Sequence, residues 1–191
     1  SDSVHIVEVG PRDGLQNEKT PISVADRITF IEALIGAGLK AVEVGAFVSP
    51  KAIPQMVGSA AVLRGVSHHT ECELPVLVPN EKGYEASQAA DAKLIAVFAA
   101  ASESFSRANI NCSIAESIDR FVPILEAARS AGVKVRGYVS CVVACPYDGS
   151  IEPKNVADVA ARLKELGCYE LSPGDAIGVG TPASILRMLD S

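Results

Sequence analysis

The sequence predicts an α/β fold built on a parallel sheet, because short apolar segments rich in β-branched residues alternate with longer segments of helical periodicity. The predicted strands are residues 5–10, 41–48, 74–79, 93–100, 134–143 and 168–175. The predicted helices are residues 23–38, 59–66, 82–90, 114–132, 153–167 and 181–191. Since parallel strands need crossover connections, this alternation favours a parallel sheet covered by helices.

The helix boundaries carry recognisable capping residues. Ser23 precedes the first helical segment as an N-cap, and Gly38 follows it, where a left-handed residue commonly ends a helix. Thr181 and Pro182 place an N-cap and a first-turn proline at the start of the last helix. These signals set the expected helix limits.

Two closures of such a sheet compete, an open doubly wound sheet and a (β/α)8 barrel. A typical barrel has about 250 residues, whereas this chain has 191 residues. Length alone therefore favours the open sheet. Because no low-complexity linker interrupts the chain, we expect a single domain over residues 1–191.

Composition argues against several classes of partner. The net charge is −6, and no run of lysine and arginine offers a surface to nucleic acid or to an anionic membrane. The longest strongly apolar run, from Leu94, is much shorter than the roughly 20 residues of a membrane-spanning helix. Five cysteines at irregular spacing indicate free thiols in a reducing compartment. A small molecule is the expected partner.

Polar side chains gather where the predicted strands end, which is where parallel α/β folds bind their ligands. They are Arg12 and Asp13 after the first strand, Glu43 in the second, Ser140 and Cys141 in the fifth, and Asp175 at the end of the sixth. We expect the charged members of this set to converge.

The chemistry of these groups suits proton transfer and enolate stabilisation at a metal. The Asp13 carboxylate is a hard oxygen ligand for Mg²⁺ or Mn²⁺. Arg12 can donate hydrogen bonds to a developing oxyanion, and Glu43 could hold Arg12 through a charge-assisted pair. A purely structural ion network of Arg12, Asp13 and Glu43 is an equally good reading of their positions.

Other motifs are weaker. The segment GVGTP at residues 178–182 lacks a complete phosphate-binding motif, so a helix cap is favoured there. His5, His68 and His69 lack the spacing of a metal-binding histidine pair, and we expect His68 and His69 in the exposed loop before the third strand. Cys141 and Cys145 form a C-x3-C pair with no second ligand pair for zinc and no visible base.

Six stretches together resemble one family. They are VEVGPRDGLQNEK, FVSPKAIPQM, PVLVPNEKGYEA, NINCSIAES, VRGYVSCVVACPYDG and GDAIGVGTP, in the expected order. The family is 3-hydroxy-3-methylglutaryl-CoA lyase, within the metal-dependent TIM-barrel lyases and synthases. This resemblance implies a (β/α)8 TIM barrel, of which the chain supplies about six βα units, and it overrides the preference for an open sheet.

The resemblance also implies residue roles. Asp13 matches a ligand of the divalent cation, Arg12 matches the donor that stabilises the enolate, and Glu43 matches its acidic partner. Asn109 matches a position that contacts the acyl-CoA, and Asp175 matches a catalytic-site position at the rim beside the metal.

The implied reaction is cleavage of 3-hydroxy-3-methylglutaryl-CoA to acetoacetate and acetyl-CoA with Mg²⁺ or Mn²⁺, as in leucine catabolism and ketone body formation. The implied partner is a small acyl-CoA substrate, and a homodimer is compatible with the resemblance. The implied location is the cytoplasm in a bacterium or the mitochondrial matrix in a eukaryote. The alternatives are a synthase that condenses acetyl-CoA with a 2-oxo acid, and an inactive truncated barrel that serves as a binding module.

The sequence departs from the family pattern in three ways. The family's further metal ligands, a His-x-His pair and an asparagine, belong to strands beyond residue 191, so we expect the C-terminal part of the barrel to be missing and the chain alone to be inactive. Pro173 and Ala176 replace the usual leucine and threonine, and Gly45 and Ala46 replace small hydroxyl residues. Arg136 is expected to be a structural charge near the site.

Overall fold

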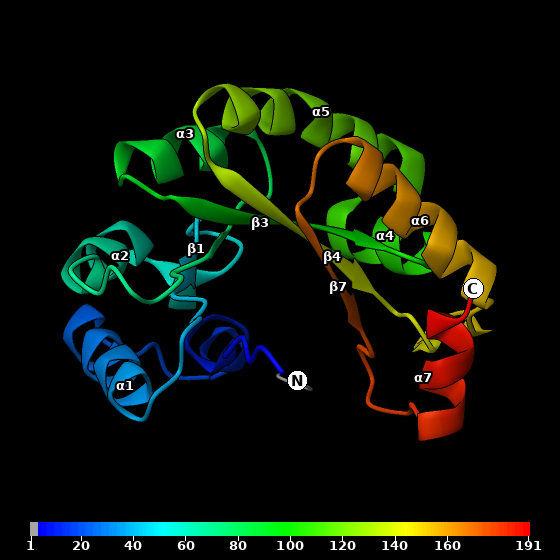
Figure 1. The fold of residues 1–191 in the computed structure, drawn as a ribbon, viewed down its shortest axis with the longest axis horizontal. Coiled ribbons are helices and arrows are strands. Elements are labelled where there is room, and N and C mark those ends of the chain that lie inside the picture. Colours follow the sequence, from blue (N-terminus) through cyan, green and yellow to red (C-terminus); the bar gives the residue numbers. More distant parts are fainter. Residues whose placement is uncertain (1–3) are drawn as a thin grey trace. The chain divides into compact units, whose positions relative to one another are not determined.

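The computed structural model describes residues 4–191. The helices are η1 (Gly10–Gly14), a π-helical turn, α1 (Val24–Gly36), η2 (Pro54–Met56), a 3-10 turn, α2 (Ser59–Val66), α3 (Glu81–Ala89), α4 (Glu103–Ile110), α5 (Ile114–Ser130), α6 (Pro153–Glu165) and α7 (Pro182–Leu189). The strands are β1 (Gly45–Ala46), β2 (Val76–Leu77), β3 (Leu94–Ala100), β4 (Lys134–Ser140), β5 (Ala144–Cys145), β6 (Gly149–Ser150) and β7 (Glu170–Gly174). The predicted α/β alternation is confirmed (Figure 1).

Five strands form a sheet in the order β1-β2-β3-β4-β7, and β5 and β6 form a separate antiparallel pair. The order follows the sequence, as expected when each strand is joined to the next by a crossover. The chain divides into two compact units, residues 1–95 and residues 96–191. The single domain over residues 1–191 stays a prediction.

In the first unit, β1 and β2 are parallel and pair over two residues each. Isolated bridges, Ala41 with Glu73 and Glu8 with Val42, continue the pairing before β1. The predicted strand over residues 5–10 was therefore wrong in extent, since Glu8 alone pairs. The reason is local: the Gly10 amide donates to the Glu8 side chain at 2.6 Å, and η1 begins at that residue.

In the second unit, β4 and β7 are parallel and pair from Arg136 with Glu170 to Ser140 with Gly174. The helix α4 and the pair β5 and β6 were missed by the sequence analysis. Ser102 caps α4 by accepting a hydrogen bond from the Phe105 amide, and a left-handed residue at Asn111 ends the helix after two turns. So short a helix has almost no periodic signal.

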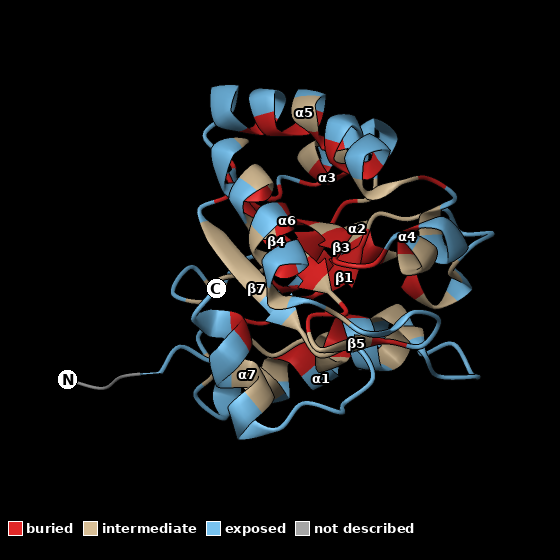
Figure 2. Cartoon of the chain, turned by 90° about the vertical axis from the view of Figure 1, so that its right-hand side faces the viewer, coloured by how far each residue is buried: buried red, intermediate tan, exposed pale blue. Residues whose placement is uncertain are grey.

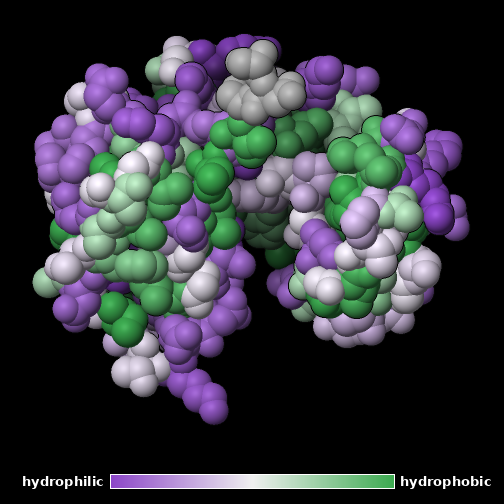
Figure 3. All heavy atoms as spheres, turned by 60° about the horizontal axis from the view of Figure 1, so that its bottom comes forward, coloured by the Kyte–Doolittle hydropathy of each residue, from purple (hydrophilic) through white to green (hydrophobic). Residues whose placement is uncertain are grey.

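The core consists of aliphatic side chains on the strands and on the inner faces of the helices, such as Ile31, Val44, Ile95, Ile118 and Leu163. Figure 2 shows β1 and β3 in the red of buried residues, while α5 and α6 expose one face. The surface drawn in Figure 3 mixes hydrophobic with hydrophilic side chains. Within residues 4–191, no helix has the length and apolarity needed to cross a membrane.

Candidate functional site

The backbone that carries Arg12 and Asp13 is a π-helical turn, η1. The Val9 carbonyl accepts hydrogen bonds from the Arg12 amide at 3.1 Å and from the Asp13 amide at 2.7 Å. Pro11 occupies the first turn, where its missing N–H costs no hydrogen bond. Single π-helical turns occur frequently at functional sites. The turn therefore places the two charged side chains directly after the Glu8 bridge.

The Arg12 guanidinium is held by two carboxylates. Its Nε donates to Glu43 Oε1 at 2.6 Å, and its Nη1 donates to Asp13 Oδ1 at 2.7 Å. Glu43 is fully buried, whereas the Asp13 side chain is 55% exposed. The predicted pairing of Arg12 with Glu43 is confirmed. The contact with Asp13 completes the ion network that was the alternative interpretation of these positions.

Asp13 fits a divalent cation as one ligand and no more. Its exposed carboxylate is a hard oxygen donor, while Glu43 is buried against Arg12. In the described part of the chain, only Glu32, His68 and His69 bring three potential metal-binding side chains together. The described residues thus offer Asp13 as a single candidate ligand, with no complete cation site around it.

A second buried arginine, Arg27, lies close to Gly45 of β1, and the sequence analysis missed it. Arg27 on α1 is fully buried and donates to the Val57 carbonyl at 2.9 Å and to Ser59 Oγ at 3.2 Å. Ser59 Oγ in turn accepts from the Ala46 amide at 3.1 Å. Burial lowers the pKa of Arg27, which stays protonated at neutral pH. In the sequence, the signal that could have predicted the burial of Arg27 was a charged residue on an otherwise apolar helix face.

The close approach of Ser59 also explains Gly45. A Cβ atom added at Gly45 would lie 2.5 Å from Ser59 Oγ and 3.2 Å from Arg27 Nη2. A hydroxyl side chain at position 45 would occupy the same place. In this chain, the hydroxyl beside position 45 is that of Ser59.

Asp175 of the second unit lies between β7 and α7. Its Oδ2 accepts a hydrogen bond from the Gly180 amide at 2.6 Å, while its Oδ1 is buried and has no hydrogen-bond partner. The segment from Gly178 to Thr181 is a helix cap, as favoured by the sequence, since Thr181 and Ser184 form a capping box. Asp175 therefore presents one acceptor atom that the chain itself does not use.

Asn109 lies on the exposed side of α4, where its Nδ2 donates to the Phe105 carbonyl at 3.1 Å. Arg136 forms an ion pair with Glu170 across β4 and β7 at 2.9 Å. The structural role expected for Arg136 agrees with this geometry. The contact of Asn109 with an acyl-CoA stays a prediction.

A thiol cluster at the end of β4 was not foreseen. Ser102 Oγ lies 3.0 Å from Cys145 Sγ and 2.7 Å from Asp148 Oδ2, so its single proton can serve only one of them at a time. Burial raises the pKa of Cys141 to about 12, with a further contribution from Cys145. For Cys145, burial opposes ionisation, but hydrogen bonds from Ser102 and from backbone amides outweigh it and lower the pKa.

Cys141 also has a left-handed backbone, with φ of 61°, which is uncommon for a residue other than glycine. Its side chain is fully buried. No disulfide occurs within residues 4–191, and all five cysteines are free thiols, as the sequence predicts.

Comparison with known proteins identifies relatives over the whole chain. The HMGL-like family matches residues 3–191. A 3-hydroxy-3-isohexenylglutaryl-CoA/hydroxy-methylglutaryl-CoA lyase of Pseudomonas aeruginosa is 56% identical over 98% of this chain and 63% of its own length. A mitochondrial hydroxymethylglutaryl-CoA lyase of Bos taurus is 55% identical over 98% of this chain and 58% of its own length.

Solved structures agree. The crystal structure of hydroxymethylglutaryl-CoA lyase from Pseudomonas aeruginosa superimposes with a TM-score of 0.94 at 57% identity, over 96% of this chain and 61% of that one. An HMG-CoA lyase from Bacillus subtilis gives a TM-score of 0.95 at 37% identity, over 100% of this chain and 64% of that one. These neighbours are TIM barrels, which confirms the barrel over the open sheet. The chain spans about three fifths of the length of the relatives it matches.

Proposed function

Because the chain belongs to the HMGL-like family, we propose that it is the part of a hydroxymethylglutaryl-CoA lyase that stabilises the enolate formed when 3-hydroxy-3-methylglutaryl-CoA is cleaved to acetoacetate and acetyl-CoA. One observation carries the proposal: the Arg12 guanidinium is held in place by buried Glu43 and exposed Asp13. The names of the relatives favour a lyase over a synthase.

The reaction requires a hydrogen-bond donor held in place at the thioester carbonyl oxygen. Removal of the proton from the tertiary hydroxyl lets the C2–C3 bond break, and the electron pair moves onto the thioester carbonyl as an enolate. Arg12 stabilises that oxygen as its negative charge grows, because a guanidinium is a strong donor that keeps its proton. Glu43 acts on Arg12 rather than on the substrate, and so it is a positioning residue.

The proposed cofactor is Mg²⁺ or Mn²⁺, with Asp13 as one ligand. When bound, the cation would act as a Lewis acid toward the substrate hydroxyl and a carboxylate oxygen. Asp13 suits this role, because its carboxylate is half exposed and belongs to the residue next to Arg12.

Asp175 and Asn109 complete the proposed set. The unpaired Oδ1 of Asp175 is a buried acceptor, which costs free energy unless a ligand or solvent uses it. Asn109 is proposed to contact the acyl-CoA. A structure of an HMG-CoA lyase in complex with coenzyme A and 3-methylmalate, 31% identical to this chain with a TM-score of 0.91, supports an acyl-CoA as the class of substrate.

The test replaces Arg12 in the full-length polypeptide. Arg12→Ala should lower kcat by about 100- to 1,000-fold, because one oxyanion donor of the transition state is lost. The KM for hydroxymethylglutaryl-CoA should change much less, since the interaction is made mainly in the transition state. Release of acetoacetate in the presence of Mg²⁺ is the readout.

Two controls accompany this measurement. Arg12→Lys keeps the positive charge but loses the planar guanidinium, so its kcat should lie between that of the unsubstituted protein and that of Arg12→Ala. The 191-residue chain by itself should be nearly inactive, because the described residues offer Asp13 as a single ligand of the catalytic cation. An unchanged kcat in Arg12→Ala would remove Arg12 from the mechanism.

A further inference from the structure

Three side chains of the first unit converge at a place that the proposed lyase chemistry does not use. Glu32 lies on α1, and His68 and His69 lie in the turn after α2. One ligand atom from each residue lies within 4.8 Å of the other two. Asp13 is not part of this group.

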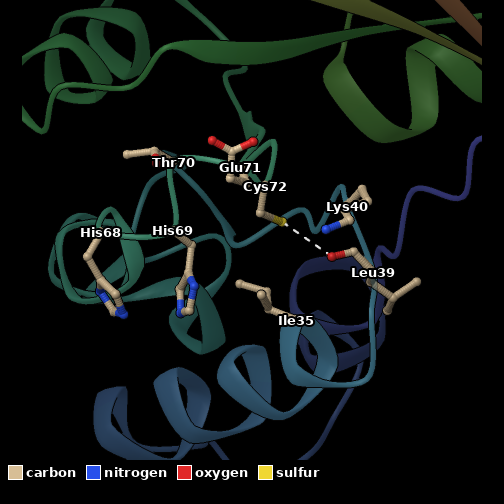
Figure 4. Close-up of a pocket in the computed structure, with 8 residues that line it drawn as sticks. All are labelled: Ile35, Leu39, Lys40, His68, His69, Thr70, Glu71 and Cys72. Atoms are coloured by element: carbon tan, nitrogen blue, oxygen red, sulfur yellow. Dashed lines mark hydrogen bonds between the residues drawn. The ribbon is translucent and has the colours of Figure 1, made fainter.

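Both imidazoles contact the carboxylate of Glu32. His69 Nε2 lies 2.6 Å from Glu32 Oε2, and His68 Nε2 lies 3.4 Å from Glu32 Oε1. The ring centroids are 4.1 Å apart and the ring planes are inclined by 39°. Figure 4 shows both rings extending from the turn toward α1. Each histidine therefore directs a nitrogen to a different oxygen of Glu32.

The backbone holds this arrangement in advance. The His69 amide donates to the Val66 carbonyl at 3.1 Å, and the Thr70 amide donates to the His68 carbonyl at 3.0 Å. The turn is thus closed by its own hydrogen bonds, and α1 packs directly against α2. A ligand would have few groups left to order, which favours binding.

We propose that Glu32, His68 and His69 bind a zinc ion. Two imidazoles and a carboxylate are a common ligand set for Zn²⁺ with one position left open, and imidazole suits Zn²⁺ better than it suits the harder Mg²⁺. Ligand atoms around tetrahedral zinc are about 3.4 Å apart for bonds of about 2.1 Å. To reach that geometry the 2.6 Å contact between His69 Nε2 and Glu32 Oε2 would widen, while the ligand atoms already lie within 4.8 Å of one another.

His68 and His69 also line a pocket of about 200 Å³, together with Lys40 and Glu71 among others. Cys72 also lines this pocket, but Figure 4 shows its Sγ directed to the Leu39 carbonyl, 3.8 Å away. Burial raises the pKa of Cys72, and the thiol is not among the three side chains whose ligand atoms lie within 4.8 Å of one another. Water is the expected fourth ligand.

Binding should tie α1 to the turn after α2 and so stabilise the first unit. A ligand that binds only the folded state raises the temperature of unfolding in a concentration-dependent way. Imidazole binds zinc in its neutral form, so binding should weaken at acidic pH.

The experiment is calorimetric titration of the full-length protein with Zn²⁺ in excess Mg²⁺, combined with a thermal unfolding series. We expect one zinc ion to bind with a micromolar or lower Kd. His69→Ala and Glu32→Gln should each weaken this binding at least tenfold and abolish the zinc-dependent rise in unfolding temperature. His68→Asn is a third variant of the same ligand set. Because the His68 side chain is 63% exposed, this substitution carries little risk to folding.

Two controls make the result specific. His5→Ala removes a histidine that lies 3.7 Å from one glutamate, Glu73, without a second imidazole, and it should leave zinc binding unchanged. Asp13→Asn removes the proposed ligand of the catalytic cation, so zinc binding at that site should be weakened. In this variant the NMR signals of His68 and His69 should still shift when zinc is added. Absence of binding, or equal binding after loss of His69 or Glu32 in variants with unchanged circular dichroism, would overturn the proposal.

Discussion

The Arg12 guanidinium has two acidic partners that differ in burial. Glu43 is 0% exposed and Asp13 is 55% exposed at the side chain. Loss of a buried partner leaves a charge without compensation, whereas an exposed partner is readily replaced by water. Because Glu43 and Asp13 bind the same guanidinium, their contributions to the free energy of unfolding can be compared directly.

We expect Glu43→Ala to lower the free energy of unfolding by about 3–5 kcal/mol, because the buried Arg12 guanidinium would lose the one of its two carboxylate partners that is itself buried. Asp13→Ala should lower it by less than about 1 kcal/mol, as is usual for exposed pairs. Urea denaturation of both variants decides the matter. Equal losses would mean that Glu43 does not hold Arg12 as described.

Gly45 is a second residue whose identity depends on one contact. Gly45→Ser should lower the free energy of unfolding by about 1–3 kcal/mol, because its Cβ would overlap Ser59 Oγ. Combining it with Ser59→Ala should recover part of that loss. Gly36→Ala is the matched control, since nothing lies within 4 Å of a Cβ there. A neutral Gly45→Ser variant would contradict the steric explanation.

At the scale of elements, the helices were better predicted than the strands. The N-caps at Ser23 and Thr181 lie where the sequence placed them, because a cap is a contact over three residues. The strands before β3 shrink to two-residue segments and single bridges, whereas β4 and β7, whose partners are similarly far apart in the sequence, pair over five residues. Local hydrogen bonding can therefore be read from neighbouring residues, and strand length cannot.

The capping box of α5 provides the test at this scale. Ser113 Oγ accepts from the Glu116 amide at 3.1 Å, and the Glu116 side chain accepts from the Ser113 amide at 2.7 Å. Ser113→Ala should lower the free energy of unfolding by about 1 kcal/mol. Ser130→Ala, at the exposed end of the same helix, should have a much smaller effect. Chemical denaturation of both variants gives the comparison.

For the whole molecule, two buried thiols link stability to pH. Burial raises the pKa of Cys168 to about 11, and burial together with Cys145 raises that of Cys141 to about 12. In the unfolded chain both thiols would ionise near pH 9. The folded state therefore keeps protons that the unfolded state loses, so stability falls as pH rises from about 9 toward these raised values.

Cys168→Ser should make that fall shallower by up to about 1.4 kcal/mol per pH unit, because the hydroxyl does not titrate in this range. The measurement is urea denaturation under reducing conditions at several pH values from 9 to 10.5. Between pH 6 and 8 the curves of both proteins should be parallel, as both thiols are then protonated in either state. Parallel curves above pH 9 would show that Cys168 ionises normally in the folded protein.

The sequence by itself determined the α/β alternation, the main helix limits, the family, and the cluster of Arg12, Asp13 and Glu43. The first two depend on periodicity and on capping over a few residues, the family depends on six short motifs in a fixed order, and the cluster depends on polar groups at strand ends. Only the tertiary structure decided that Arg27 and Ser59 support the first strand, that Ser102 meets Cys145, and that Glu32 meets the two histidines. Those contacts join residues about 30 to 40 positions apart, and no local pattern encodes which side chains a fold brings together.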